Sequence, residues 1–183
     1  TISGTLDIAG STLTMNGASV VGGTITALDG TVDANGTFTA AGGNVTFTGA
    51  GDLLLSGVVA SLGALTGSTH GTVTYDAAGA QSLPAGPGPG AQTYVNLIVG
   101  GAADQTKTLL SNVIVSGDFT TDASVTTAIG AFELDVAGAT LINGTVTIST
   151  GTLDANGSFN ATGAGDATGG FVTFTGAGNL ELA

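Results

Sequence analysis

The sequence predicts an all-β protein, a parallel β-solenoid of short strands, and three observations support this fold class. Glycines recur every six or seven residues, and the residues between them alternate between apolar and polar. No segment of ten or more residues shows the 3.6-residue period of an amphipathic helix. About three such strands would make one coil of about 18–22 residues, and stacked coils would share one continuous core.

Each segment of the N-terminal third fits this interpretation. Every piece that ends at a glycine holds one or two large apolar residues beside Thr, Asp or Ser, which predicts a short strand followed by a turn. These pieces are residues 5–10, 11–17, 18–23, 24–30, 31–36, 37–43 and 44–49. Turn signals this close together favour the solenoid over tandem β-sandwich repeats, the alternative, in which turns come about every 8–12 residues.

The chain contains an internal repeat, in which residues 1–62 recur as 122–183. Residues 31–38 read TVDANGTF and residues 152–159 read TLDANGSF, and the second copy then carries a six-residue insertion in ATGAGDATGGF. We expect DANG to form the same corner at the same place in both copies. Asn-Gly would supply two residues with positive φ, between apolar residues that are buried.

One segment interrupts the regular spacing of this single continuous solenoid, residues 1–183. All three prolines lie in PAGPGPG, which cannot occupy a central strand. The sequence therefore predicts a wide turn or a protruding loop over residues 84–91. Tyr75 and Tyr94 flank it and could pack on each other beneath it.

Composition excludes several classes of partner. Thirteen acidic residues stand against one lysine, and the net charge of −12 disfavours nucleic acid and anionic membrane surfaces. No apolar run reaches the length of about 18 residues that a spanning helix needs. The absence of cysteine excludes disulfides, thiol catalysis and zinc–thiolate sites.

Catalytic constellations are not apparent, and we expect no enzyme and no cofactor. The single histidine, His70, lies in the turn-like GSTHG, without the serine and acid pattern of a hydrolase. Asp29 and Asp33 lie four residues apart, as do Asp118 and Asp122, but this spacing is not diagnostic of a glycosidase pair.

Two kinds of binding or modification site remain as hypotheses. Asp29, Asp33 and Asp154 lie in or beside acidic turns that could hold calcium weakly, although aspartate also occupies turns for its own backbone hydrogen bonds. Asn35 and Asn156 lie in N-x-[ST] sequons, and DANGT and DANGS also resemble the acidic acceptor sequence of bacterial N-glycosylation. Further sequons begin at Asn44, Asn143 and Asn160.

The central part of the chain carries a family resemblance. The sequences GTVTYDAAGAQSLP, TYVNLIV and TKTLLSNVIVSGDFT resemble the repeat pattern of bacterial β-strand-repeat surface proteins, which are akin to filamentous-haemagglutinin-like adhesins and autotransporter passengers. The resemblance implies a β-helix at the cell surface with a structural or adhesive role. It implies no catalytic residues.

The two ends of the sequence suggest how such a protein could work. TISGTLDIAG and TFTGAGNLELA are ordinary repeat sequence, without a polar, Pro-rich or helical cap. Either the chain is part of a longer array, or subunits stack head to tail as a homo-oligomer or filament. We therefore expect an extracellular structural protein, the subunit of a fibre, sheath or surface layer. The alternatives are a stalk segment of a large adhesin and, less in keeping with two Tyr and no Trp, a carbohydrate-active β-helix.

Overall fold

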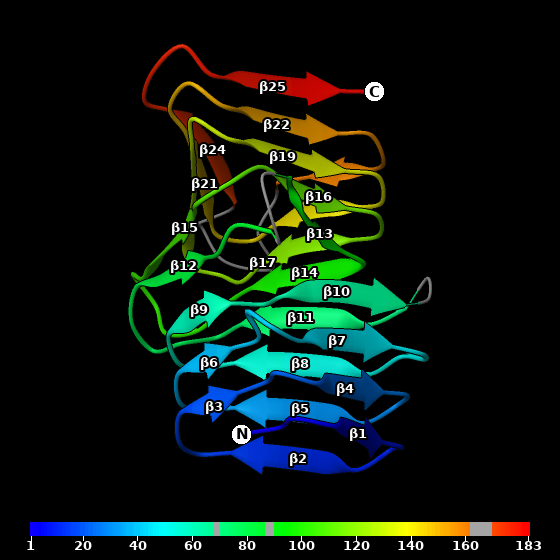
Figure 1. Ribbon diagram of the computed structural model, residues 1–183. Coiled ribbons are helices and arrows are strands. Elements are labelled where there is room, and N and C mark those ends of the chain that lie inside the picture. Colours follow the sequence, from blue (N-terminus) through cyan, green and yellow to red (C-terminus); the bar gives the residue numbers. More distant parts are fainter. Residues whose placement is uncertain (68–69, 87–89, 162–169) are drawn as a thin grey trace.

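The protein is a parallel β-solenoid without helices in the part of the chain described below (Figure 1). The computed structural model describes residues 1–67, 70–86, 90–161 and 170–183. Every strand pair in it is parallel, and each strand pairs with the strand three places later in the chain or with the one three places earlier. The predicted fold class is confirmed, and the sandwich alternative is wrong.

Three faces wind around one core. Face A consists of β1 (Thr5–Ile8), β4 (Thr24–Ala27), β7 (Asn44–Phe47) and β10 (Ala64–Gly67), and above them β13 (Gln92–Tyr94), β16 (Val113–Val115), β19 (Glu133–Val136), β22 (Thr152–Ala155) and β25 (Asn179–Leu182). Face B is one sheet, formed by β2 (Thr12–Met15), β5 (Thr31–Ala34), β8 (Asp52–Leu55), β11 (Thr72–Tyr75), β14 (Asn96–Val99), β17 (Phe119–Thr121), β20 (Thr140–Ile142) and β23 (Phe159–Asn160). Face C consists of β3 (Ser19–Val20), β6 (Phe38–Thr39) and β9 (Val59–Ser61), and above them β12 (Gln81–Leu83), β15 (Thr106–Leu109), β18 (Thr126–Gly130), β21 (Thr145–Ile148) and β24 (Phe171–Phe174).

The core follows from the two-residue alternation along each strand. In β5, Val32 and Ala34 are buried while Thr31 and Asp33 point outward, and β8 and β22 repeat this pattern. Parallel register places like positions above one another, so that Val32 stacks beneath Leu53 and Leu53 beneath Val73. The result is a mainly apolar core along the axis, with a few buried polar side chains, and its burial supplies most of the stabilising free energy.

Coil length agrees with the sequence prediction over most of the chain. Thr5 pairs with Thr24, 19 residues later, and Thr31 pairs with Asp52, 21 residues later. A longer coil joins Thr72 to Asn96, 24 residues later, and includes the proline-rich segment. Pro84 at its start is buried, but residues 87–89 of the predicted loop lie outside the described part of the chain, as does most of the insertion, residues 162–169.

Glycine columns form two of the corners, and here the explanation from sequence was wrong. Neither Asn35 nor Gly36 has positive φ, and the same holds for Asn156 and Gly157. Glycine is required instead because consecutive coils touch: a Cβ on Gly36 would lie 2.5 Å from the carbonyl oxygen of Gly17. The equivalent atom on Gly157 would clash with Gly138 in the same way.

The two copies of the internal repeat lie on different faces, contrary to the expectation of one shared corner position. The first DANG corner joins β5 on face B to β6 on face C, whereas the second joins β22 on face A to β23 on face B. The reason is numerical: β22 is the seventeenth strand after β5, and 17 is not a multiple of three. The short face is accordingly face C in the lower coils and face B in the last two.

We predict that Gly36→Ala lowers the free energy of unfolding by about 1–3 kcal/mol, because the added methyl group must displace the backbone of the coil below. Gly17 begins the same column and has no atom within 4 Å of its ideal Cβ position. The matched variant Gly17→Ala should therefore be neutral or stabilising by less than about 1 kcal/mol. Urea unfolding of both variants tests this, and equal losses would contradict the column explanation.

Candidate functional site

Within the described residues, two of the three faces of the solenoid are interrupted at one level, which we call the joint. On face A, β10 does not pair with β13, and on face C, β9 does not pair with β12. Face B continues without a break through the pairing of β11 with β14. Figure 1 shows the lower and upper stacks meeting at this level. Two rows of backbone hydrogen bonds between strands are therefore missing at the joint.

Gln81 links the two stacks beside the interruption on face C. It begins β12, and its buried side chain donates from Nε2 to the carbonyl oxygens of Leu55 and Gly57, both at 2.7 Å. The Oε1 atom accepts from the backbone N–H of Ala77 at 3.4 Å. One side chain thus links the upper stack to the end of β8 and to the corner that follows it.

Lys107 is the next side chain of the same inward column, directly above Gln81 in register. It is fully buried, and its Nζ donates to the carbonyl oxygens of Ala77 at 2.7 Å and Gly79 at 2.8 Å. Burial lowers the pKa of this ammonium, while the negative charge of Asp76 opposes the shift. The only lysine of the chain therefore serves the joint as a buried hydrogen-bond donor.

Tyr75 and Tyr94 link β11 on face B to β13 on face A. Their hydroxyl oxygens lie 2.9 Å apart and their rings meet edge to face, with centroids 6.4 Å apart. Both side chains are buried, and desolvation raises the pKa of each phenol above its ordinary value. The expected packing of the two tyrosines is confirmed.

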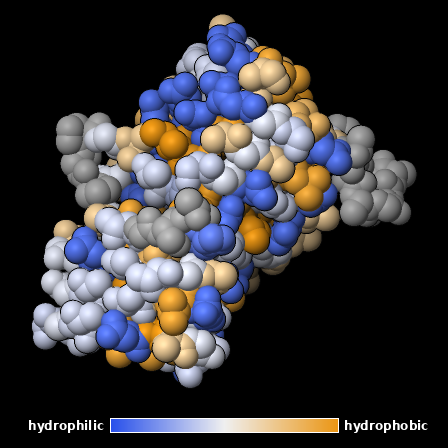
Figure 2. Space-filling view, turned by 90° about the vertical axis from the view of Figure 1, so that its right-hand side faces the viewer, coloured by the Kyte–Doolittle hydropathy of each residue, from blue (hydrophilic) through white to orange (hydrophobic). Residues whose placement is uncertain are grey.

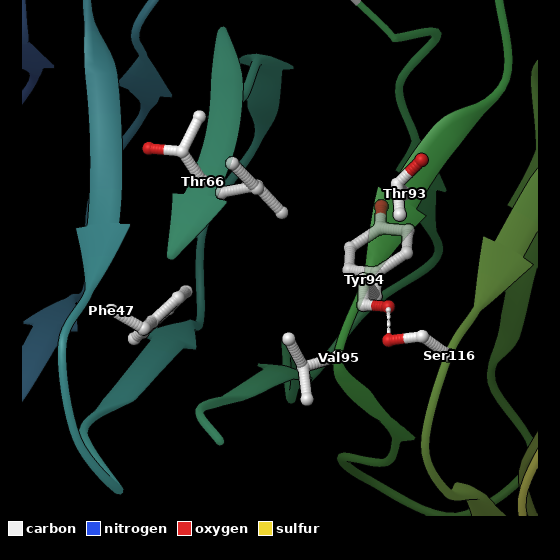
Figure 3. Close-up of a pocket in the computed structure, with 7 residues that line it drawn as sticks. Phe47, Thr66, Thr93, Tyr94, Val95 and Ser116 are labelled. Atoms are coloured by element: carbon white, nitrogen blue, oxygen red, sulfur yellow. Dashed lines mark hydrogen bonds between the residues drawn. The ribbon is translucent and has the colours of Figure 1, made fainter. Parts of the chain in front are cut away.

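The joint contains two cavities where backbone pairing is missing. A cavity of about 170 Å³ separates β10 from β13, and Figure 3 shows Thr66 and Phe47 on one side of it and Thr93, Tyr94 and Val95 on the other. A groove of about 370 Å³ lies between β9 and β12, along Val58, Val59 and Ala80. None of the residues lining either cavity is a carboxylate, histidine or lysine, so neither holds an acid–base pair.

The outer surface is made of side-chain rows that run along the axis. Thr26, Thr46 and Thr66 stack on face A, and the hydroxyls of Thr46 and Thr66 lie 2.9 Å apart. Near the upper end of the same face, Asp135, Asp154 and Glu181 occupy one row. Figure 2 shows pale residues of intermediate hydropathy dominating the lower part of the molecule, with blue and orange residues scattered among them.

The three calcium candidates are not gathered into one site. Asp29 lies at the corner after β4 and accepts a hydrogen bond from the Ala50 N–H at 3.1 Å. Asp33 points outward from β5 and accepts from the Asn35 amide at 3.3 Å, and Asp154 lies far away on β22. Among the described residues no group of three or more His, Asp or Glu side chains is placed to hold a metal ion.

The residues considered for catalysis lie apart as well. His70 is exposed on the connection between β10 and β11, where Ser68 and Thr69 lie outside the described residues. Asp118 follows the A–B corner and accepts from the Ala139 N–H at 2.8 Å, whereas Asp122 follows β17 at the next corner. These carboxylates sit at turns, where Asp118 satisfies the backbone of the neighbouring coil.

The sequon asparagines differ in exposure. Asn35, Asn44, Asn156 and Asn160 are exposed and Asn143 is half-buried. The Asn35 amide donates to Asn16 at 3.2 Å, and the Asn156 amide donates to Asp135 at 2.9 Å. Both amides thus contact the coil below, and glycosylation of either remains a prediction.

Gln81 and Lys107 were not identified from the sequence, although one signal was present. In TKTL the lysine occupies the position that alternation assigns to the core, between two outward threonines. A charged residue in the core of a strand requires buried acceptors. Which carbonyl groups supply them follows only from the interrupted pairing at the joint.

No family model, curated protein or solved structure matches this chain. In the described part of the chain, no helix is long and apolar enough to cross a membrane.

We predict that Gln81→Met destabilises the fold by about 1–3 kcal/mol, because an apolar side chain of similar size removes the donor to the Gly57 carbonyl and the acceptor of the Ala77 N–H. The Leu55 carbonyl keeps its bond from the Asp76 N–H. Ser82→Ala, at the exposed neighbouring position, is the matched control and should change stability by less than about 0.5 kcal/mol. Urea unfolding monitors both variants. Equal stability of the two would show that Gln81 does not hold the joint together.

We predict that the protein loses stability as the pH rises above about 10, the ordinary pKa of tyrosine. Folded Tyr75 and Tyr94 keep their protons there, and the unfolded chain releases them. Each tyrosine should lower the free energy of unfolding by about 1.4 kcal/mol per pH unit. Tyr94→Phe should therefore show a shallower slope than the wild type, while the opposing contribution of Lys107 is common to both. An unchanged slope would contradict the assignment.

Proposed function

We propose that this protein is an extracellular structural subunit that extends a fibre, sheath or surface layer by stacking of its solenoid ends. The observation that carries the proposal is the state of the outermost strands. In the described structure, β1 and β2 at one end and β23, β24 and β25 at the other pair with a neighbour on one side only. Open backbone groups of this kind are templates for another strand.

The lower edge is open in a defined way. The N–H groups of Thr31 and Asn35 donate to the carbonyl groups of Ser11 and Met15 on the coil below. Because successive residues of a strand turn their N–H and C=O groups to opposite sides, those of Thr12 and Thr14 point away from the solenoid. A strand placed beneath β2 would find these groups unpaired.

The side walls support a durable role outside the cell. They carry rows of threonine rather than charged pairs, and the only lysine, the sole site for trypsin-like cleavage after Lys or Arg, is buried. No carboxylate, histidine or lysine lines either cavity. Together with the resemblance to bacterial β-strand-repeat surface proteins, these features favour a structural role.

A stalk segment of an adhesin is the second candidate, and the unbroken face B favours it. Eight strands in one sheet give a rod that could hold a separate binding module away from a cell. The two candidates differ in behaviour: a stalk segment would remain a discrete rod, whereas a stacking subunit would form fibres of constant width.

We predict that the purified chain forms such fibres and that Thr14→Pro abolishes them. Proline removes the outward N–H and places its ring on the docking edge, yet it is tolerated on an edge strand. Thr14→Val keeps the N–H and should still assemble. Negative-stain microscopy and sedimentation velocity measure assembly, and circular dichroism checks the fold. A wild-type chain that stays a monomer at high concentration would overturn the proposal.

A further inference from the structure

We infer that a second copy of this chain docks onto the C-terminal end after rotation about the solenoid axis by one face. Face C of the incoming copy then lies on face B, face A lies on face C, and face B lies on face A. This inference rests on the proposed stacking and specifies how one copy is oriented on the next. It follows from the displaced repeat, the lengths of the edge strands and the charges they carry.

The upper end of the molecule repeats a level found within its lower half. By the internal repeat, β23, β24 and β25 correspond to β6, β7 and β8, which are followed in the lower stack by β9, β10 and β11. Yet β6, β7 and β8 lie on faces C, A and B, and their counterparts lie on faces B, C and A. The upper end is therefore equivalent to an internal level after rotation by one face.

The lower end supplies strands for this level in the required order. Ile2 forms a bridge to Val21 on face C, with Ile2 N–H donating to the carbonyl of Val20 at 2.8 Å. The chain then continues into β1 on face A and β2 on face B. With rotation by one face, the Ile2 segment covers β23, β1 covers β24 and β2 covers β25, and the winding continues without a missing strand.

Strand lengths agree with the rotated docking. β1 and β24 have four residues each, as have β2 and β25, whereas β23 has two and meets the short Ile2 segment. Without rotation, the short Ile2 segment would cover four-residue β24, and β1 would cover β25. That docking would also leave no strand directly above β23 on face B. The winding requires a strand on face B after β25, but the unrotated copy begins on face C.

Charge separates the two dockings further. In the rotated docking, the register of β8 with β11 places Thr14 of the incoming copy beside Glu181. In the unrotated docking, Asp7 would lie beside Glu181, and like charges on adjacent strands repel. The rotated docking thus fits in winding, strand length and charge.

Paired cysteines test the rotation, because the chain has no cysteine of its own. Neighbouring strands lie about 4.8 Å apart, within the Cα separation that a disulfide spans. Under mild oxidation, T14C/E181C should give a ladder of covalent oligomers on a non-reducing gel. The control D7C/E181C lacks both repelling carboxylates, so it favours the unrotated docking more than the wild type does. It should nevertheless give no ladder of covalent oligomers.

Each result separates the rotation from the stacking itself. A ladder from D7C/E181C alone would overturn the rotation and leave end-to-end stacking in place. Fibres of the wild type without a ladder from either pair would also overturn the inferred docking. A wild-type chain that does not assemble would overturn the proposed function, and the inference with it. Reduced samples of both variants should assemble like the wild type, which confirms that the substitutions leave the fold intact.

Discussion

Parallel pairing between consecutive coils is the constraint on which the rest of this structure depends. Within each sheet, every strand lies directly above the strand of the previous coil, so that core side chains, outward threonines and corner backbones form columns along the axis. At the Gly36 and Gly157 corners the backbones approach so closely that a single methyl group would not fit. Glycine therefore serves the contact between coils there, rather than an unusual turn conformation.

The joint shows what happens where this constraint is relaxed. Two faces lose their backbone pairing at one level, and Gln81, Lys107 and the tyrosine pair supply hydrogen bonds in its place. Burying a polar side chain costs free energy unless it is hydrogen-bonded, and here the partners are backbone carbonyl groups, the Ala77 N–H and, for the two tyrosines, each other. Above this level Thr127 continues the inward column with an unpaired hydroxyl, and Val146 returns it to apolar character.

The sequence predicted the features that depend on local pattern. Glycine spacing and two-residue alternation gave the solenoid, its coil length and the burial of Val32 and Phe38, and the position of the prolines suggested that Tyr75 and Tyr94 could meet. It did not predict the face on which the second repeat lies, because one strand more or fewer in the irregular middle shifts every later strand. The acceptors of Gln81 and Lys107 were equally hidden, since they belong to residues 24 to 30 positions away along the chain.

If copies of this chain stack into the proposed filaments, the burial of Lys107 affects how neighbouring filaments meet side by side. With the sole Lys or Arg of the chain enclosed, the exterior presents carboxylates without any guanidinium or exposed lysine ammonium to neutralise them. Two rods lying parallel would face each other with the same sign along their whole length, and this repulsion keeps them apart at low ionic strength. Bundling of the proposed filaments would then depend on dissolved cations that screen these carboxylates.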